Sequence, residues 1–531
     1  MGDVETGSCP AEVQLLGHRG ESFQIAQLHR TALSAGELVR PAQHGLFRIS
    51  NQSYMNLVLD GTSCRGYVQR ETAFPAVGKH SCRAGARSIR AWHTTERGTR
   101  PRPPSRARTA VAPGRRIPRT IRIPSPRTTN DPAANSPLTP GTHTGNDRAG
   151  TMDPSDFEEV LRTVRDFVRN QVVPLEDEIE RTNAIPQHIR ETAASMGLFG
   201  FALPQEHGGL GLSMSEDVRL SIELGYATPA FRSMFGTNNG IAGQVISKYG
   251  TEEQKERWLP ELASGDVVAS FALTEEGAGS DPSGLRTRAV RDGSDYLISG
   301  AKRFITNAPE AGLFVVFART DENAEPHKGI SVFLVEAGSA GLHVGPPDEK
   351  MGQAGALTAE VHFDSVRVPA DALVGGEEGT GFSAAMSSLS RGRLHIAAIC
   401  VGLAERILDE AIGFATTARQ GGAPISRFQL VQAMLAESKA ELYAARSMVL
   451  RAADEFDAGT DTRLAPSCAK LFCSEMVSRA ADRAVQVHGG SGYMRGVPVE
   501  RLFRDSRLFR IYEGTSEIQK LIIAKQLLRD A

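Results

Sequence analysis

Three long amphipathic segments in the last third of the chain constrain its fold most. They run from Phe382 to Arg419, from Phe428 to Ala458 and from Pro466 to about His488, with only short connections between them. Apolar residues that recur at the period of an α-helix over such lengths, joined by short loops, are typical of helical bundles. We therefore predict a C-terminal four-helix bundle over residues 381–531.

The region before the bundle has two different sequence patterns. Residues 152–268 show helical periodicity, which begins with Asp153 as an N-cap and Pro154 at the first helical position. Residues 269–380 instead hold short runs of β-branched and aromatic residues, separated by turn signals such as Asp292-Gly293. The predicted fold class is α+β and multidomain, with an N-terminal α-helical domain, a barrel-like middle β-domain and the C-terminal bundle.

Residues 1–151 do not have the pattern of a domain. Between Ser81 and Asn130 arginines and prolines recur throughout, against a single acid, Glu96. Such a composition does not bury enough apolar surface to order itself, so we predict a disordered, basic, proline-rich extension. We expect that Met152 is the true start of the protein. A disordered tail and an organelle transit peptide are the alternatives.

Composition narrows the classes of function. The formal net charge of the 531 residues is −2, which does not indicate a nucleic-acid partner, and no apolar run is long enough for a membrane span. The six cysteines form no Cys-x-x-Cys pair and have no histidine at zinc spacing, which indicates a reducing compartment and no structural metal. We expect a cytoplasmic protein, or a mitochondrial matrix protein if the basic leader is a transit peptide.

The stretch from Phe509 to Lys520 holds the candidate catalytic residue, Glu513. Ser516 and Gln519 have the spacing of a capping box, which predicts that a last helix begins near Thr515. Gly514 suits a sharp turn, and the positive end of the helix would help to keep a carboxylate beside it ionised. Glu513 therefore suits a general base, and an ordinary acid at a helix start is the alternative.

Three further stretches combine glycine, hydroxyl and amide side chains. They are Phe271 to Asp281, Lys302 to Asn307 and Gln486 to Tyr493. The first offers bare backbone amides and hydroxyls to a flat ligand, and the second places an aromatic ring and a hydroxyl two residues apart. Each also has a purely structural interpretation, as a glycine loop, an edge strand and a helix C-cap respectively.

Together with the Glu513 stretch, these motifs resemble the acyl-CoA dehydrogenase family, most of all its short-chain and short-branched-chain members. The resemblance runs from about Asp153 to the C-terminus. It depends on Thr-Glu-x-Gly-Ala-Gly-Ser-Asp, Phe-Ile-Thr-Asn, Gln-Val-His-Gly-Gly-x-Gly-Tyr and Ile-Tyr-Glu-Gly-Thr-Ser-Glu-Ile-Gln. Residues 1–151 have no counterpart in the family.

The resemblance implies a flavoprotein that binds FAD and oxidises an acyl-CoA thioester to the trans-2-enoyl-CoA, with Glu513 as the base that removes the α-proton. It implies a homodimer or homotetramer, and electron-transfer flavoprotein as the acceptor. The implied cofactor-binding residues are Thr274, Ser280, Phe304, Thr306, Arg419, Gln429, Gln486, Gly489, Gly490, Thr515 and Glu517. The implied substrate-binding residues are Ser280, Arg391, Arg393 and Gly514.

Two departures from the family pattern bear on these assignments. Some members carry the base on the first bundle helix, at the position of Gly392, so its absence there favours Glu513. After Arg419, the usual Arg-x-x-Phe-Gly is replaced by Arg-Gln-Gly-Gly-Ala. The alternative functions are an acyl-CoA oxidase that uses oxygen directly and a catalytically idle flavoprotein that serves as an assembly partner.

Overall fold

The computed structural model describes residues 152–529 in full and, before them, only five strands. Contacts divide the chain into residues 1–135 and residues 136–531. In the first unit β1 and β2 pair antiparallel, and β3, β4 and β5 form an antiparallel sheet. Apart from these strands, the predicted disorder of residues 1–151 lies outside the described residues. The strands are β1 (Glu12–Val13), β2 (Phe23–Gln24), β3 (His44–Ser50), β4 (Ser53–Leu59) and β5 (Gly66–Glu71).

The second unit begins with a helical domain, as predicted. Its first helix, α2, starts where the sequence indicates, because the Asp153 side chain accepts a hydrogen bond of 2.8 Å from the Ser155 N–H. A capping box of Ser213 and Glu216 begins α5. The helices are α2 (Pro154–Phe167), α3 (Glu176–Thr182), α4 (Gln187–Ser195), α5 (Met214–Leu224), α6 (Pro229–Gly240), α7 (Ala242–Tyr249) and α8 (Glu252–Ser264).

Helix α6 lies within the predicted helical domain, but no amphipathic pattern in the sequence marks the helix itself. All twelve of its residues are buried, so it has no polar face and no amphipathic period. Its start nevertheless follows local rules, because Thr228 is the N-cap and Pro229 occupies the first turn. This buried helix becomes important because it forms one wall of the pocket described below.

The middle domain is a curled seven-stranded sheet. Its order is β10-β9-β7-β8-β12-β11, and β6 pairs in parallel with β9. The two longest strands, β8 and β12, are antiparallel neighbours of 12 residues each. Strand β8 begins at Asp295 and continues through Thr306. The strands are β6 (Ala269–Ala272), β7 (Arg288–Asp292), β8 (Asp295–Thr306), β9 (Leu313–Arg319), β10 (Ile330–Glu336), β11 (Leu342–Val344) and β12 (Thr358–Pro369).

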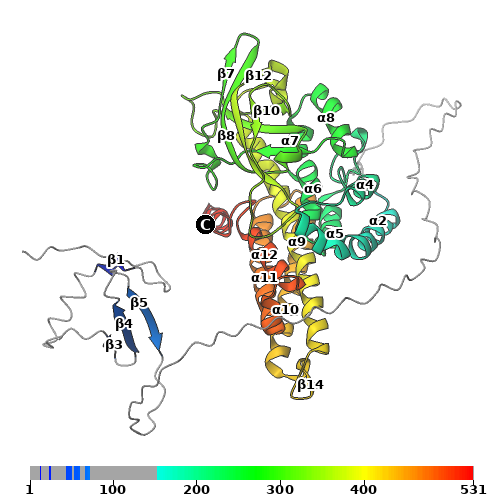
Figure 1. Cartoon of the computed structure of the whole chain (residues 1–531). Coiled ribbons are helices and arrows are strands. Elements are labelled where there is room, and N and C mark those ends of the chain that lie inside the picture. Colours follow the sequence, from blue (N-terminus) through cyan, green and yellow to red (C-terminus); the bar gives the residue numbers. More distant parts are fainter. Residues whose placement is uncertain are drawn as a thin grey trace, which may run out of the picture. The chain divides into compact units, whose positions relative to one another are not determined.

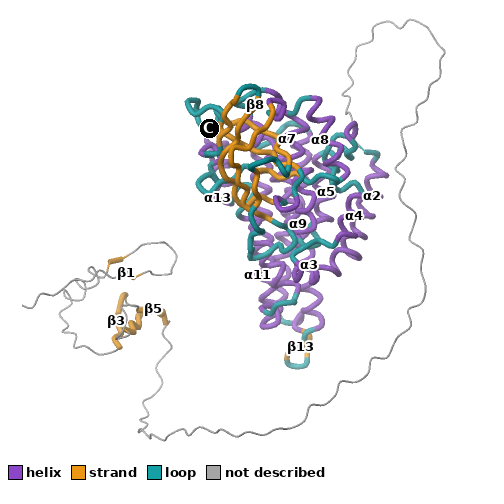
Figure 2. The backbone as a smooth tube through the Cα atoms, turned by 45° about the horizontal axis from the view of Figure 1, so that its top comes forward, coloured by secondary structure: helices purple, strands orange, loops and turns teal. Residues whose placement is uncertain are grey.

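The C-terminal domain consists of three long helices and two shorter ones. The long helices extend away from the sheet toward a hairpin of β13 (Arg419–Gln420) and β14 (Ala423–Pro424), as Figures 1 and 2 show. Gly421 and Gly422, both with positive φ, form the two-residue turn of that hairpin. The helices are α9 (Gly381–Thr417), α10 (Gln429–Asp457), α11 (Leu464–His488), α12 (Pro498–Ser506) and α13 (Ser516–Arg529).

One apolar core joins the two helical domains. It contains residues of α2 and α5 together with residues of α9, α10 and α11, so the N-terminal helices pack directly on the bundle. Within the described part of the chain, no helix is both long and apolar enough to cross a bilayer. Across residues 152–529, no group of three or more His, Cys, Asp or Glu side chains is arranged to hold a metal ion.

Candidate active site

The loop between η10 (Arg507–Arg510) and α13 holds Glu513 in an unusual backbone conformation. Its φ is 57°, and that of Gly514 is 85°. A left-handed conformation at a residue other than glycine is uncommon, and such residues concentrate at functional sites. Thr515 then caps α13, since its Oγ1 accepts a hydrogen bond of 3.2 Å from the Ile518 N–H.

The predicted capping pair therefore has a different role. Ser516 does not cap the helix, because its hydroxyl donates to Glu475 Oε1 at 2.7 Å. The Gln519 Nε2 reaches back and donates to the carbonyl oxygens of Glu513 and Gly514, each at 3.1 Å. The N-cap of α13 is therefore Thr515, one residue before the predicted cap, and Gln519 instead holds the loop that carries Glu513.

Lys470, on α11, supports the same loop and was not predicted from the sequence. Its side chain is fully buried, and its Nζ donates a hydrogen bond of 2.6 Å to the Gly514 carbonyl oxygen. Burial lowers the pKa of Lys470 to about 8, although the neighbouring Cys400 and Glu513 oppose that shift. No sequence signal separates this lysine from a solvent-exposed one on a helix.

The Glu513 carboxyl group is prepared to accept a proton. Its Oε2 is shielded from solvent and has no hydrogen-bond partner. Burial raises the pKa of Glu513 above that of an ordinary glutamate, while the positive charges of Arg232, Lys470 and Arg393 act in the opposite direction. A carboxylate with a raised pKa and a free oxygen has the properties of a general base.

Gly392, on α9, leaves room for this carboxyl group. A Cβ atom added at Gly392 would lie 2.8 Å from Glu513 Oε2. Gly392, which occupies the position where some family-like sequences carry an alternative base, therefore lies directly opposite Glu513.

Glu513 lines a pocket of about 500 Å³, a volume that includes the part open to solvent. This is within the range of small-molecule sites. Three regions that are far apart in the sequence meet there: α6, the end of β8 with the segment before β12, and the loop before α13. The lining residues are Arg232, Ser233, Gly236, Thr237, Ile241, Thr306, Lys350, Gln353, Ala356, Thr358, Leu508, Tyr512 and Glu513.

The predicted flavin-ring residues lie beside this pocket. Thr306 is part of its lining. The Thr274 carbonyl oxygen accepts a hydrogen bond of 2.9 Å from the Arg303 N–H, which brings the loop after β6 onto β8. Phe304 follows Arg303 at a bulge in the pairing with β12, with φ of 58° and 60% of its surface exposed. Ser280 lies exposed in the same loop as Thr274.

A second group of predicted residues lies outside the pocket lining, on the bundle and at the start of α13. Gln486 is in the last turn of α11, and its carbonyl oxygen accepts from the Gly489 N–H. Arg419 lies in the hairpin, where its Nη1 donates to the Gly422 carbonyl oxygen at 3.2 Å. The members of this group are Arg419, Gln429, Gln486, Gly489, Gly490, Thr515 and Glu517.

The two arginines predicted beside the substrate have different environments. Arg391 is bound in a buried network, through 2.9 Å to Asp217 Oδ2 and 3.2 Å to the Leu212 carbonyl oxygen. Arg393 is also buried, has no partner for its Nε and lies near enough to Glu513 to affect its pKa. Arg393 therefore lies near Glu513, whereas Arg391 belongs to the neighbouring buried network.

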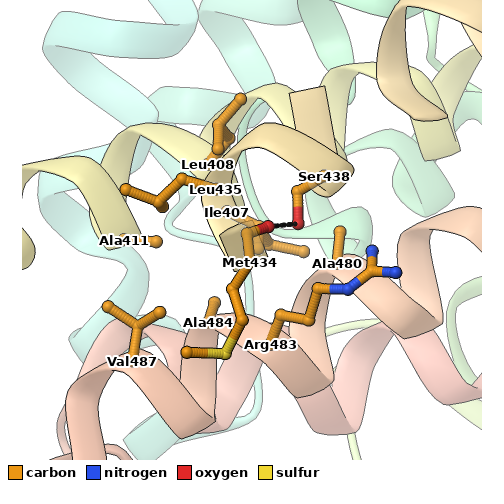
Figure 3. Close-up of a pocket in the computed structure, with 10 residues that line it drawn as sticks. All are labelled: Ile407, Leu408, Ala411, Met434, Leu435, Ser438, Ala480, Arg483, Ala484 and Val487. Carbon is orange, nitrogen blue, oxygen red and sulfur yellow. Dashed lines mark hydrogen bonds between the residues drawn. The ribbon is translucent and has the colours of Figure 1, made fainter. Parts of the chain in front are cut away.

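A separate pocket of about 200 Å³, a volume that includes space open to solvent, lies between α9, α10 and α11 (Figure 3). Its lining is mostly aliphatic, with Ser438 bonded to the Met434 carbonyl oxygen and Arg483 at one side. None of the predicted site residues lines it.

Three family models match the chain in succession. They are the N-terminal, middle and C-terminal domains of acyl-CoA dehydrogenase, at residues 154–266, 270–366 and 379–528. The chain belongs to the acyl-CoA dehydrogenase family. The family assignment, the fold class and the oxidoreductase class expected from the sequence are thereby confirmed.

Relatives of known name agree with this assignment. A probable acyl-CoA dehydrogenase of Bacillus subtilis, YngJ, is 40% identical over 370 residues, covering 70% of this chain and 97% of its own. The human mitochondrial short-chain specific acyl-CoA dehydrogenase is 37% identical over 376 residues, covering 71% and 91%. A Bacillus anthracis acyl-CoA dehydrogenase solved with FAD has a TM-score of 0.67 and 32% identity, covering 71% of this chain and 67% of its own.

The cofactor of this acyl-CoA dehydrogenase is FAD, and the chain's residues fit it. An added Cβ at Gly279 or Gly490 would meet no atom of the chain within 4 Å, so packing within the chain does not explain these two glycines. Gly489 has φ of 57° and ψ of −138°, a conformation that other residues rarely adopt, so its backbone alone accounts for a glycine there. The exposed ring of Phe304 provides a flat apolar surface next to Thr306.

Proposed function

We propose that this acyl-CoA dehydrogenase removes hydrogen from the α and β carbons of a short-chain or short-branched-chain acyl-CoA and produces the trans-2-enoyl-CoA. The observation that carries this proposal is the Glu513 carboxyl group, whose buried Oε2 has no partner and which lines the same pocket as Thr306. The similarity to the human short-chain enzyme supports the substrate class.

In this reaction Glu513 accepts the α-proton of the thioester at Oε2. The main-chain N–H of Glu513 donates a hydrogen bond to the thioester oxygen, where negative charge develops. FAD, when bound, supplies the acceptor for the β-hydrogen, which leaves with its electron pair as hydride. One proton and one hydride are thus removed, and the double bond forms between the two carbons.

The remaining residues hold this geometry. Lys470 and Gln519 fix the Glu513–Gly514 backbone through its carbonyl oxygens, so the carboxyl group stays in the pocket. An acyl chain in the pocket excludes water from Glu513, which raises its pKa further toward that of the carbon acid.

We assign the flavin ring to Thr274, Phe304 and Thr306, with Ser280 between cofactor and substrate, and Arg393 and Gly514 to the thioester end. Residues Arg419, Gln429, Gln486, Gly489 and Gly490 would hold the adenosine and pyrophosphate part of an FAD that is bound mainly by a neighbouring subunit. Thr515 and Glu517 would meet the cofactor after the catalytic loop. This arrangement requires at least a homodimer, and we propose electron-transfer flavoprotein as the acceptor and the cytoplasm as the location.

Anaerobic mixing of the purified flavoprotein with butyryl-CoA tests the proposal. We expect the visible flavin absorbance to bleach and expect no bleaching in Glu513→Gln with the same FAD content. Bleaching that persists in Glu513→Gln would contradict the role of Glu513. Peroxide formation without an added acceptor would instead identify an oxidase, and the absence of bleaching by any acyl-CoA would identify a catalytically idle flavoprotein.

A further inference from the structure

Arg232 places a permanent positive charge in the wall of the pocket that Glu513 lines. The residue lies on the buried helix α6 and is 8% exposed. Burial raises the pKa of Glu513, and among the cations that oppose this rise Arg232 acts most strongly. Because the interaction of two charges depends on their separation, the influence of Arg232 on the base depends on where its guanidinium group is held.

A chain of two hydrogen bonds ties Arg232 to an acid on another helix. The Arg232 Nε donates to His395 Nε2 at 2.5 Å, and His395 Nδ1 lies 2.8 Å from Asp217 Oδ1. His395 belongs to α9 and Asp217 to α5, and all three side chains are buried. The chain thus joins three helices and ends in the pocket wall, although neither Asp217 nor His395 lines the pocket.

This chain requires one protonation state of His395. An arginine only donates hydrogen bonds, so His395 Nε2 has to be an unprotonated acceptor, and the ring proton is on Nδ1, where Asp217 accepts it. Ser221 supports the arrangement, since its hydroxyl donates to Asp217 Oδ1 at 2.9 Å and its oxygen lies 2.9 Å from His395 Nδ1. Burial and the Arg232 charge lower the pKa of His395 to about 4, so the ring is neutral in the neutral pH range.

Both ends of the chain are restrained by further contacts. The second oxygen of Asp217, Oδ2, accepts a hydrogen bond of 2.9 Å from Arg391. At the other end, the Arg232 guanidinium group lies over Gly236, where an added Cβ would be only 2.7 Å from the Arg232 Cζ. The guanidinium group is therefore held by His395 at its Nε and by the α6 backbone at Gly236.

We propose that Asp217 and His395 are positioning residues of the active site, which act through Arg232 to hold a positive charge in the pocket wall beside Glu513. The inference rests on the proposed function, because it concerns the base of that reaction. Asp217 fixes the His395 tautomer, as a buried carboxylate fixes the histidine of a hydrolase triad. The tautomer in turn gives Arg232 its acceptor.

Four cationic side chains lie near the base or line its pocket, each on a different element. They are Arg232 on α6, Arg393 on α9, Lys470 on α11 and Lys350 before β12. Tyr512 lines the same pocket, but burial raises its pKa and keeps it neutral. Within residues 152–529 only Arg232 of these four bonds to His395, so breaking the chain changes one charge and leaves the others in place.

Two substitutions at His395 test the proposal on the full FAD-loaded protein, with butyryl-CoA and a dye acceptor. His395→Phe keeps a flat ring stacked on Phe201, 5.9 Å away between centroids, but offers Arg232 no acceptor. We expect the rising limb of kcat/KM against pH to move to higher pH, because a displaced Arg232 no longer lowers the Glu513 pKa as far. On the limb kcat/KM should fall by about tenfold, and above it the change should be small. His395→Gln can accept from Arg232 and donate to Asp217, and should recover most of the loss.

Asp217→Asn tests the tautomer. Arg391 only donates, so the asparagine oxygen has to face it, and the asparagine NH₂ then faces His395 Nδ1. The ring proton moves to Nε2, against the Arg232 N–H, and the limb should shift as in His395→Phe. A limb at the wild-type position in both variants would overturn the proposal. If neither variant folds, His395→Asn decides by the same shift, because its shorter amide still reaches Asp217 but not Arg232.

Phe201→Leu is the matched control for packing. It removes the ring that stacks on His395 and leaves the hydrogen-bonded chain intact. Its melting temperature should fall while the limb stays in place. A limb that moves as far as in His395→Phe would show that packing around the ring, and not the chain, sets the charge beside the base.

A double-mutant cycle assigns the effect to Arg232. In an Arg232→Gln background, His395→Phe should not move the limb further, because the two changes act on the same charge. Additive shifts would contradict action through Arg232. If butyryl-CoA and other acyl-CoA thioesters fail to bleach the flavin of the wild-type protein, the proposed function itself fails, whereas bleaching with an unmoved limb in the variants removes only the present inference.

Discussion

Two buried glutamates of this protein, each close to a buried lysine, have opposite hydrogen-bonding environments. In the middle domain, Glu275 is bonded to Lys302 Nζ at 2.7 Å and to the N–H groups of Arg286 and Thr287 at 2.6 and 2.9 Å. Beside the pocket, Glu513 Oε2 has no partner, and the nearby Lys470 bonds to a carbonyl oxygen of the loop instead.

The difference in hydrogen bonding sets the ionisation of the two acids. Burial alone would raise the pKa of Glu275, but the Lys302 charge and the hydrogen bonds bring it below that of an ordinary glutamate. Burial raises the pKa of Glu513, and the surrounding cations only partly oppose it. A satisfied carboxylate stabilises a loop, whereas an unsatisfied one is available for proton transfer.

The largest expected effect comes from neutralising the unsatisfied acid. Glu513→Gln should lower kcat by about 1,000-fold or more, because it removes the general base. Its melting temperature should be unchanged or higher, because a buried unpaired carboxylate is replaced by a neutral group. Steady-state kinetics and thermal unfolding measure the two effects, and a kcat within tenfold of the wild type would show that another group is the base.

Neutralising the satisfied acid should have the opposite profile. Glu275→Gln leaves Lys302 buried without its counter-charge, so the free energy of unfolding should fall by about 3 to 5 kcal/mol. Urea denaturation of the flavoprotein measures this loss. The control is Glu252→Gln, which breaks the exposed pair with Lys255 and should cost less than about 1 kcal/mol. If Glu275→Gln and Glu252→Gln lost equal free energy of unfolding, the buried pair would stabilise the protein no more than the exposed one.

Lys470→Met tests how the neighbouring cation affects the base. The kcat/KM of the wild type should rise with pH as Glu513 loses its proton. The midpoint of this rising limb of the pH profile should lie above the pKa of an ordinary glutamate. Because the Lys470 charge lowers the Glu513 pKa, removing it should move the limb to higher pH. Loss of the bond to Gly514 should also lower kcat by about tenfold.

Lys470→Arg keeps the positive charge and serves as the control for that measurement. Its limb should stay near that of the wild type, even if the longer side chain disturbs the loop. A limb that moves to lower pH in Lys470→Met would contradict the electrostatic argument.

The smallest effect is expected from a substitution at Gly392, which faces the Glu513 carboxyl group. Gly392→Ala would place a Cβ near Glu513 Oε2, which has to rotate away, so kcat should fall by about three- to tenfold. Stability should not fall, because alanine is favoured over glycine in a helix by about 1 kcal/mol. Parallel kinetics and unfolding check that activity and stability separate, and an unchanged kcat would show that the carboxyl group does not need this space.

The long helices were predictable because their apolar period repeats over many turns. The bounds of α9, α10 and α11 differ from the predicted segments by two residues or fewer. The strands were found from β-branched runs, although β8 extends further than its most apolar part. Helix α6 escaped prediction because a helix that is buried on every side carries no amphipathic stripe.

The sequence by itself determined the order of the domains, the family and the identity of the acid in the last loop, since these follow from local periodicity and from motifs within short stretches. Only the tertiary structure decided what surrounds that acid. Arg232, Lys470 and Gly392 come from α6, α11 and α9, and no local pattern marks them. Their effect on Glu513 depends on burial and distance, and a folded core sets both.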